Sequence, residues 1–184
     1  MFLIVGLGNP GKEYISTRHN IGRELILEWQ KKSGFADFEF DKKINALVSK
    51  NKKAILLLPE IFVNKSGNAV VPAGRFYKIK PKDIIVIHDD ADIELGRAKL
   101  TYNRSSAGHK GVDSVRRALK TEAFWRLRLG IQKKKRVEAM KLVLQKFSPA
   151  EQTALKKLKK KIFAGLSLLL EKSPEMAMNE VNRS

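Results

Sequence analysis

The stretch FLIVGLGNPG, residues 2–11, decides the fold class of this chain. An apolar run leads into a glycine-rich turn, and Tyr14 and His19 follow within one short loop. Proteins of the α/β class build their sites in this way, with permissive backbone and polar side chains at the carboxyl end of a buried strand. The stretch therefore predicts a strand over 2–7 and a site directly after it.

The glycines of this turn also match the pattern G-x-G-x-x-G of dinucleotide-binding proteins, at Gly6, Gly8 and Gly11. That pattern requires a helix immediately after the turn and an acidic residue at the end of the next strand. Here Pro10 follows, residues through 20 have the pattern of a loop, and the nearby Glu24 and Glu28 fall in the next predicted helix. These features disfavour a dinucleotide site. A plain Gly-Pro connection between strand and helix remains an alternative.

Hydrophobic patterning along the rest of the chain predicts alternating strands and helices. Further strands are expected at 47–48, 54–58, 83–87, 97–102 and 126–131, and helices at 21–32, 66–77, 109–120, 149–171 and 174–182. Ser66 is expected to cap its helix, and Ser148-Pro149-Ala150-Glu151 has the form of a capping box. The alternation predicts an α/β protein with one domain over 1–184, a three-layer α/β/α sandwich around a mixed, mostly parallel twisted sheet. The C-terminal helices begin at about residue 149.

Composition limits the setting of the protein. The chain has 184 residues and no cysteine, which excludes disulfides and thiolate metal sites. It contains no apolar run of the ~18 residues that a membrane span needs and no signal-peptide pattern at Met1. No long unpaired apolar stripe is evident. We therefore expect a cytoplasmic monomer that does not enter a membrane.

Charge is the second strong signal. Lys and Arg number 37 against 19 Asp and Glu, a net charge of +18. The segment from Arg97 to Lys161 alone carries 20 basic and 4 acidic side chains. Such a concentration favours a polyanionic partner, nucleic acid first and an anionic membrane surface second. The alternative is an ordinary solvated face, because the lysines of 156–161 alternate with apolar residues at helical spacing.

Three polar clusters follow apolar strands, and together they suit hydrolysis by water. They are Asn9 with Tyr14 and His19, the segment 62–67, and His88-Asp89-Asp90-Ala91-Asp92. If the strands are parallel neighbours, one rim holds a histidine base, a carboxylate to orient it and amides to bind an oxyanion. The nucleophile pattern G-x-S-x-G is absent. The acidic cluster could hold Mg²⁺, but it lacks zinc-site spacing, and each acidic residue alone could be a turn or a cap.

These residues resemble a known family when they are taken in order. The motifs are GLGNPG at 6–11, Tyr14, TRHN at 17–20, F-x-N-x-SG at 62–67, HDD-x-D at 88–92, AGH-x-G at 107–111, RLR-x-GI at 126–131 and KFS at 146–148. Their combination and order resemble the bacterial peptidyl-tRNA hydrolases, from residue 4 to about 150. The resemblance implies cleavage of the ester between a peptide and the 3′ ribose of tRNA, with peptidyl-tRNA as partner and no cofactor or metal.

The resemblance also assigns roles to individual residues. His19 would be the general base that activates water, and Asp89 would orient the ring of His19. Asn9 and Asn64 would position the peptide and stabilise the oxyanion, and Tyr14 would line the site.

Two departures from the family pattern concern how substrate is held. Lys110 stands where the family has a substrate-binding asparagine, and it can instead meet a phosphate of the acceptor end. Arg128 matches the arginine of the family's clamp on the tRNA 5′ phosphate, but Thr101 replaces the clamp lysine, so that Lys99 or Arg104 would have to substitute. The segment 132–136 is also shorter and more basic than in the family. The changed loop at Lys110 and the extreme charge keep a non-catalytic RNA-binding relative of the same fold as the alternative. Whether the lysine-rich helix at 151–161 contacts RNA stays open.

Overall fold

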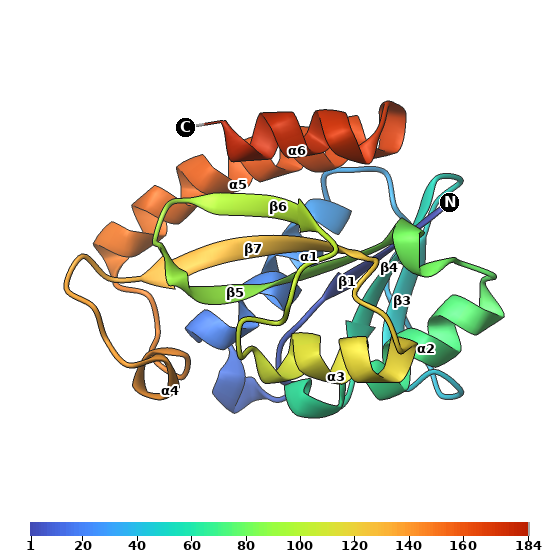
Figure 1. Ribbon diagram of the computed structural model, residues 1–184, viewed down its shortest axis with the longest axis horizontal. Coiled ribbons are helices and arrows are strands. Elements are labelled where there is room, and N and C mark those ends of the chain that lie inside the picture. The colour runs from blue at the N-terminus through green and yellow to red at the C-terminus, as the bar shows by residue number, and fades with distance from the viewer. Residues whose placement is uncertain (184) are drawn as a thin grey trace.

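The computed structural model describes residues 1–183 and contains a seven-stranded sheet with the order β2-β3-β4-β1-β5-β7-β6 (Figure 1). The strands are β1 (Phe2–Gly6), β2 (Glu39–Asp41), β3 (Ala46–Lys50), β4 (Ala54–Pro59), β5 (Ile84–Glu94), β6 (Ala98–Tyr102) and β7 (Trp125–Gln132). The helices are α1 (Ile21–Gln30), α2 (Gly67–Phe76), α3 (Lys110–Leu119), α4 (Ala139–Leu142), α5 (Pro149–Glu171) and α6 (Pro174–Asn182). Short 3₁₀ turns are η1 (Lys12–Tyr14), η2 (Arg18–Asn20), η3 (Val63–Lys65) and η4 (Pro81–Asp83).

The centre of the sheet is parallel, and its edges are antiparallel. Strands β4, β1, β5 and β7 run in one direction, whereas β2, β3 and β6 pair with antiparallel neighbours. This confirms the mixed, mostly parallel sheet. It also brings the carboxyl ends of β1, β4 and β5 to the same edge, where polar clusters were predicted to meet.

Helices cover both faces of the sheet, because the apolar side chains of its strands alternate between two cores. In β1, Leu3 and Val5 pack with α2 and α3, whereas Ile4 packs on the opposite face with α1 and α5. Figure 1 shows α2 and α3 on one side and α5 and α6 on the other. The three-layer sandwich is thereby confirmed.

Close packing of α1 against β5 positions the loop that precedes this helix. Gly22 lies in the first turn of α1, and a Cβ atom there would stand 2.3 Å from the carbonyl oxygen of Ile87. Only a glycine lets the helix approach the strand so closely. Because η2 ends where α1 begins, this contact brings His19 next to the middle of β5.

The structure corrects several local predictions. Residues 88–92 lie inside β5, not after it, because β7 continues to pair with them. Ser66 does not cap α2, since its hydroxyl donates to the carbonyl of Val63 within η3. Strand β2 and helix α4 were not predicted. The capping box at Ser148 and Glu151 is confirmed.

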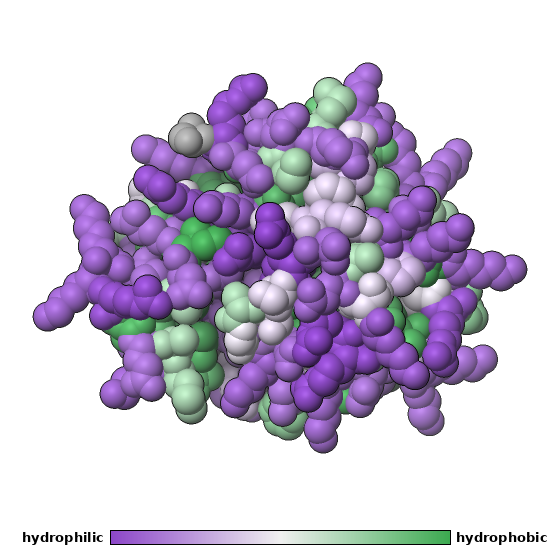
Figure 2. All heavy atoms as spheres, in the orientation of Figure 1, coloured by the Kyte–Doolittle hydropathy of each residue, from purple (hydrophilic) through white to green (hydrophobic). Residues whose placement is uncertain are grey.

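One face of the molecule is mostly hydrophilic. Figure 2 shows charged and polar groups over most of this face, with apolar surface at the lower left, where Figure 1 places α4. Among residues 1–183 no helix is both long and apolar enough to cross a membrane.

Candidate active site

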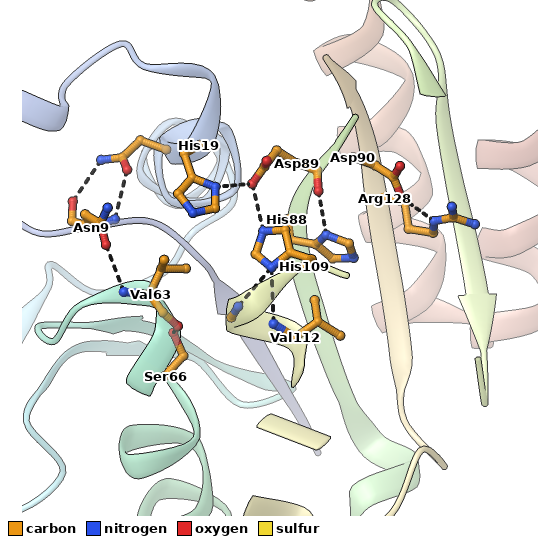
Figure 3. Close-up of polar contacts among 12 residues, drawn as sticks. Asn9, His19, Val63, Ser66, His88, Asp89, Asp90, His109, Val112 and Arg128 are labelled. Atoms are coloured by element: carbon orange, nitrogen blue, oxygen red, sulfur yellow. Dashed lines mark hydrogen bonds and ion pairs between the residues drawn. The ribbon is translucent and has the colours of Figure 1, made fainter. Parts of the chain in front are cut away.

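Three side chains from separate elements meet at the rim of the sheet. His19 comes from η2, Asp89 from β5, and His109 is the N-cap residue of α3 (Figure 3). The carboxylate oxygen Oδ1 of Asp89 lies 2.8 Å from Nδ1 of His19 and 2.9 Å from Nε2 of His109. The predicted pair of His19 and Asp89 is therefore in contact, and His109 is a third member that the sequence analysis gave no role.

The hydrogen bonds of His109 determine which ring nitrogens of the cluster carry protons. Its Nδ1 accepts from the backbone amides of Gly111 and Val112, at 3.1 and 3.2 Å. Nε2 of the neutral ring must therefore carry the proton and donate it to Asp89. The ionised carboxylate also accepts from Nδ1 of His19, which leaves Nε2 of His19 with a free lone pair. This is the tautomer that a general base needs.

The electrostatics of the cluster agree with this assignment. Burial opposes ionisation of Asp89, but electrostatic attraction and hydrogen bonds from His109 and His19 outweigh it, so the pKa of Asp89 lies well below its ordinary value. Burial likewise opposes protonation of His19, yet the hydrogen bond and charge of Asp89 hold the pKa of His19 above its ordinary value. Lys110 acts in the opposite direction and lowers the pKa of His19. The result is an anionic carboxylate beside a histidine whose pKa is raised above its ordinary value.

His88 belongs to the support of the site. The ring is 1% exposed, its Nδ1 donates to the carbonyl of Asp89 at 2.7 Å, and it packs edge-on against His109. Burial and the neighbouring His109 place the pKa of His88 well below its ordinary value. The ring is therefore neutral and cannot serve as a proton carrier for substrate from this position.

Asn9 is oriented by its surroundings. Its backbone exchanges two hydrogen bonds of 2.9 Å with the side chain of Asn20. Its side-chain oxygen accepts from the backbone amide of Val63 at 2.8 Å. Because the oxygen is used inside the protein, the amide nitrogen is the end that can donate to a substrate oxygen.

The backbone of the histidine loop is held from the far end of the chain. The amides of Arg18 and His19 donate to the carbonyls of Gln145 and Val143, both at 2.9 Å. The guanidinium of Arg18 is fully buried and bonds both carboxylate oxygens of Glu151 at 2.7 Å. These contacts fix the position of His19 independently of its own side chain.

The remaining predicted residues lie on elements next to those that carry this cluster. Tyr14 is half-buried and packs edge-on against Phe62, with 6.4 Å between the ring centres. Asn64 is exposed on η3, next to the residue that Asn9 binds, and Lys110 is exposed as the first residue of α3. Arg128 lies on β7, where its Nε donates to Asp90 at 2.7 Å. Figure 3 shows Asn9 and the Asp90–Arg128 pair on opposite sides of the histidines.

Strands β6 and β7 gather cations on one face of the sheet. Lys99 is the direct cross-strand partner of Arg128, and Thr101 is that of Arg126. Arg126 is only 2% exposed, and its Nε and Nη1 atoms have no hydrogen-bond partner within residues 1–183. Cross-strand partners and residues two apart in a strand share a face, so Lys99, Arg126 and Arg128 form one group. This group surrounds Thr101, the position at which the sequence lacked a lysine.

A metal ion fits this cluster poorly. The facing atoms of His19, Asp89 and His109 lie within 4.8 Å of one another, a spacing that a metal could bridge. However, both ring nitrogens that face Asp89 carry protons in the tautomers assigned above. Metal binding would have to break both hydrogen bonds to Asp89.

Known proteins resemble this chain over nearly its whole length. The family model described as "Peptidyl-tRNA hydrolase" matches residues 3–184. The peptidyl-tRNA hydrolase of Aquifex aeolicus (strain VF5) is 40% identical over 185 residues, which cover 98% of this chain and 96% of that protein. The one from Caldanaerobacter subterraneus subsp. tengcongensis is 37% identical and covers 99% of this chain and 100% of its own. The crystal structure of peptidyl-tRNA hydrolase from Acinetobacter baumannii superposes with a TM-score of 0.90 at 32% identity, covering 99% and 94% of the two chains.

Proposed function

This chain belongs to the peptidyl-tRNA hydrolase family, enzymes that hydrolyse an ester bond, and from that premise we propose that it cleaves peptidyl-tRNA with a water molecule activated by His19. One observation carries the mechanism. Asp89 accepts one hydrogen bond from Nδ1 of His19 and one from Nε2 of His109. This leaves Nε2 of His19 free to accept a proton. A binding protein without activity would have no need for a base prepared in this way.

The reaction follows from the position of that lone pair. Nε2 of His19 takes a proton from water while the water oxygen attacks the ester carbonyl carbon. The bond between that carbon and the ribose oxygen then breaks, and the imidazolium returns the proton to the departing oxygen. Asp89 stabilises the imidazolium during the interval, because its carboxylate stays ionised.

Asn9 supplies the complementary charge stabilisation. Its amide nitrogen donates to the carbonyl oxygen as negative charge develops there, and Asn64 on the neighbouring turn holds the peptide. Tyr14 and Phe62 provide an aromatic wall for the peptide on the same side.

The tRNA lies on the opposite side, over the cations of β6 and β7. Lys99, Arg126 and Arg128 share that face, and phosphates are attracted to such a group. Arg126 supports this assignment, because a buried guanidinium with unpaired donors gains from a nearby anion. Lys110 adds a further cation beside the histidines.

Peptide release from N-blocked aminoacyl-tRNA tests the mechanism. We expect turnover by the natural protein, and a His19→Ala variant that binds the substrate but hardly cleaves it. Undiminished cleavage by His19→Ala would overturn the role of His19. No turnover by the natural protein would instead favour the non-catalytic RNA-binding alternative.

Binding to tRNA at several salt concentrations tests the basic face. Arg128→Ala should weaken binding and make the dependence of log K on log salt shallower by about one phosphate contact. An unchanged slope would show that the phosphates of tRNA do not meet Arg128.

A further inference from the structure

All three histidines of this chain bond to one residue, Asp89. His19 and His109 donate to its carboxylate. The third, His88, donates from Nδ1 to the backbone carbonyl of Asp89, with 2.7 Å between nitrogen and oxygen (Figure 3). The carboxylate that orients the general base is therefore held through its side chain and through its main chain, and the mechanism proposed above uses only the side chain.

The carbonyl of Asp89 needs this donor because the neighbouring strand has ended. Strand β1 pairs with β5 up to the register of Gly6 with Ile87, and the amide of Leu7 donates to the carbonyl of Ile87 at 2.9 Å. In a parallel ladder, backbone groups two residues apart point to the same neighbouring strand. The carbonyl of Asp89 therefore points past the last paired residue of β1. The ring of His88 takes the place of the amide that a longer strand would supply.

The surroundings of His88 fix its tautomer and keep the ring neutral. A carbonyl can only accept, so Nδ1 carries the proton and Nε2 has the lone pair. The ring is 1% exposed, and burial, His109 and Arg126 lower its pKa against the opposing effect of Asp89. The ring therefore takes no part in proton transfer, and its hydrogen bond to Asp89 is a fixed part of the structure.

The ring of His88 offers little else that an apolar ring could not supply. Its edge packs against His109 with 4.7 Å between the ring centres, and a phenyl ring could make the same contact. Its Nε2 is buried and has no hydrogen-bond partner within residues 1–183, an arrangement that costs free energy. What distinguishes imidazole from a phenyl ring at this position is therefore the donor at Nδ1.

We propose that His88 is a positioning residue for the hydrolysis, which holds the main chain of Asp89 so that its carboxylate meets His19 and His109 together. The inference rests on the proposed function, since it explains how the partner of the general base is kept in place. Both bonds to the carboxylate go to one oxygen, Oδ1, so a small movement of Asp89 weakens both. Because it is buried, His88 acts through Asp89 and does not contact the substrate.

Three substitutions separate the donor of His88 from its ring. His88→Phe keeps a ring and removes Nδ1, His88→Asn places an amide nitrogen close to the position of Nδ1, and His88→Gln places it near the position of Nε2. In the Phe and Gln variants, kcat for N-blocked aminoacyl-tRNA should fall about 10- to 100-fold, because a displacement of about 1 Å can cost that much. His88→Asn should keep kcat within a fewfold of the natural protein. KM should hardly change in any variant.

The pH dependence of kcat/KM is a readout that a loss of stability alone would not move. His19 faces Asp89 of β5 and His109 and Lys110 of α3. Burial lowers the pKa of His19, Asp89 raises it and Lys110 lowers it. A weaker contact with Asp89 in His88→Phe lowers the pKa of His19, so the acidic limb should move to lower pH. His88→Asn should leave the limb in place.

Gln30→Met is the matched control. Gln30 is 7% exposed at the far end of α1 and donates to the carbonyl of Ala36 at 2.9 Å, so this change also removes a buried bond from side chain to backbone. It should lower stability in urea without changing kcat or the acidic limb. Urea unfolding also establishes that each His88 variant is folded under the assay conditions.

Three results would overturn the role of His88: normal kcat in His88→Phe, equal losses in His88→Asn and His88→Phe, or an acidic limb that stays in place in His88→Phe. Each of them presupposes normal turnover by the natural protein. Absence of that turnover would instead contradict the proposed function itself.

Discussion

The orientation of Asn9 leads to a prediction in which activity and stability separate. Asn9→Asp preserves shape and retains an oxygen that can accept the 2.8 Å hydrogen bond from the amide of Val63. It replaces the outward-facing NH₂ group with a second oxygen, so the donor to the oxyanion is lost. Removing one such donor lowers kcat by about 10²–10³, equivalent to about 2.7–4 kcal/mol of transition-state stabilisation. Repulsion between the new carboxylate and the developing charge should place the loss at the upper end of this range.

Asn9→Ala is the matched comparison. It removes the donor to substrate and also the acceptor for Val63, a residue that is 6% exposed. An unpaired buried amide costs about 1–3 kcal/mol, so the alanine variant should unfold at lower urea concentration than the aspartate variant. Both variants should lose activity.

The assays are kcat for peptide release from N-blocked aminoacyl-tRNA and equilibrium unfolding in urea. If Asn9→Asp kept kcat within a fewfold of the natural protein, the amide nitrogen would not contact the oxyanion. If the two variants lost stability equally, the bond from Val63 would not orient the side chain.

Three further changes test the supports of the site. Lys110→Ala removes a charge that lowers the pKa of His19, so the acidic limb of kcat/KM against pH should move to higher pH; a limb that stayed in place would show that this charge does not reach the base. Glu151→Leu leaves the fully buried guanidinium of Arg18 without its partner and should cost about 3–5 kcal/mol in urea unfolding, and Arg18→Met/Glu151→Leu should recover much of it. Equal stability of the single and double variants would contradict that pairing. Gly22→Ala places a methyl group against the carbonyl of Ile87, so it should lower the free energy of unfolding by about 1–3 kcal/mol and also lower kcat. A loss of stability with normal kcat would show that α1 does not position His19.

Most of the fold could be predicted from local sequence signals. The apolar runs of β1 and β4 and the capping box of α5 are each contained in a few consecutive residues, and the structure has them where they were predicted. The extension of β5 through Asp89 could not be predicted in this way, because polar residues do not look like a buried strand. They stay in the sheet because β7 pairs with them, as in the register of Asp89 with Leu129.

The contact between His19 and Asp89 was predictable from the sequence, but the groups that hold these two side chains in place were not. His19 and Asp89 were identified from their placement after strands and from the family pattern, and they are in contact. The contribution of His109 depends on two backbone amides of α3 and on the arrival of β5, which no local pattern contains. The available signals were its position as the first residue of the helix predicted over 109–120 and its place in the motif AGH-x-G at 107–111. The burial of Arg126 likewise follows from strand pairing and has no mark in the sequence.

The order in which the chain is synthesised matters for the loop of His19, because the backbone amides of Arg18 and His19 donate to the carbonyls of Gln145 and Val143. The histidine is synthesised early, but the residues that hold its backbone come more than a hundred positions later, and Glu151 later still. A partly synthesised chain therefore exposes the histidine without the contacts that hold it in place. The surroundings of His19 are therefore completed only after the segment that contains Gln145 and Glu151 has been synthesised.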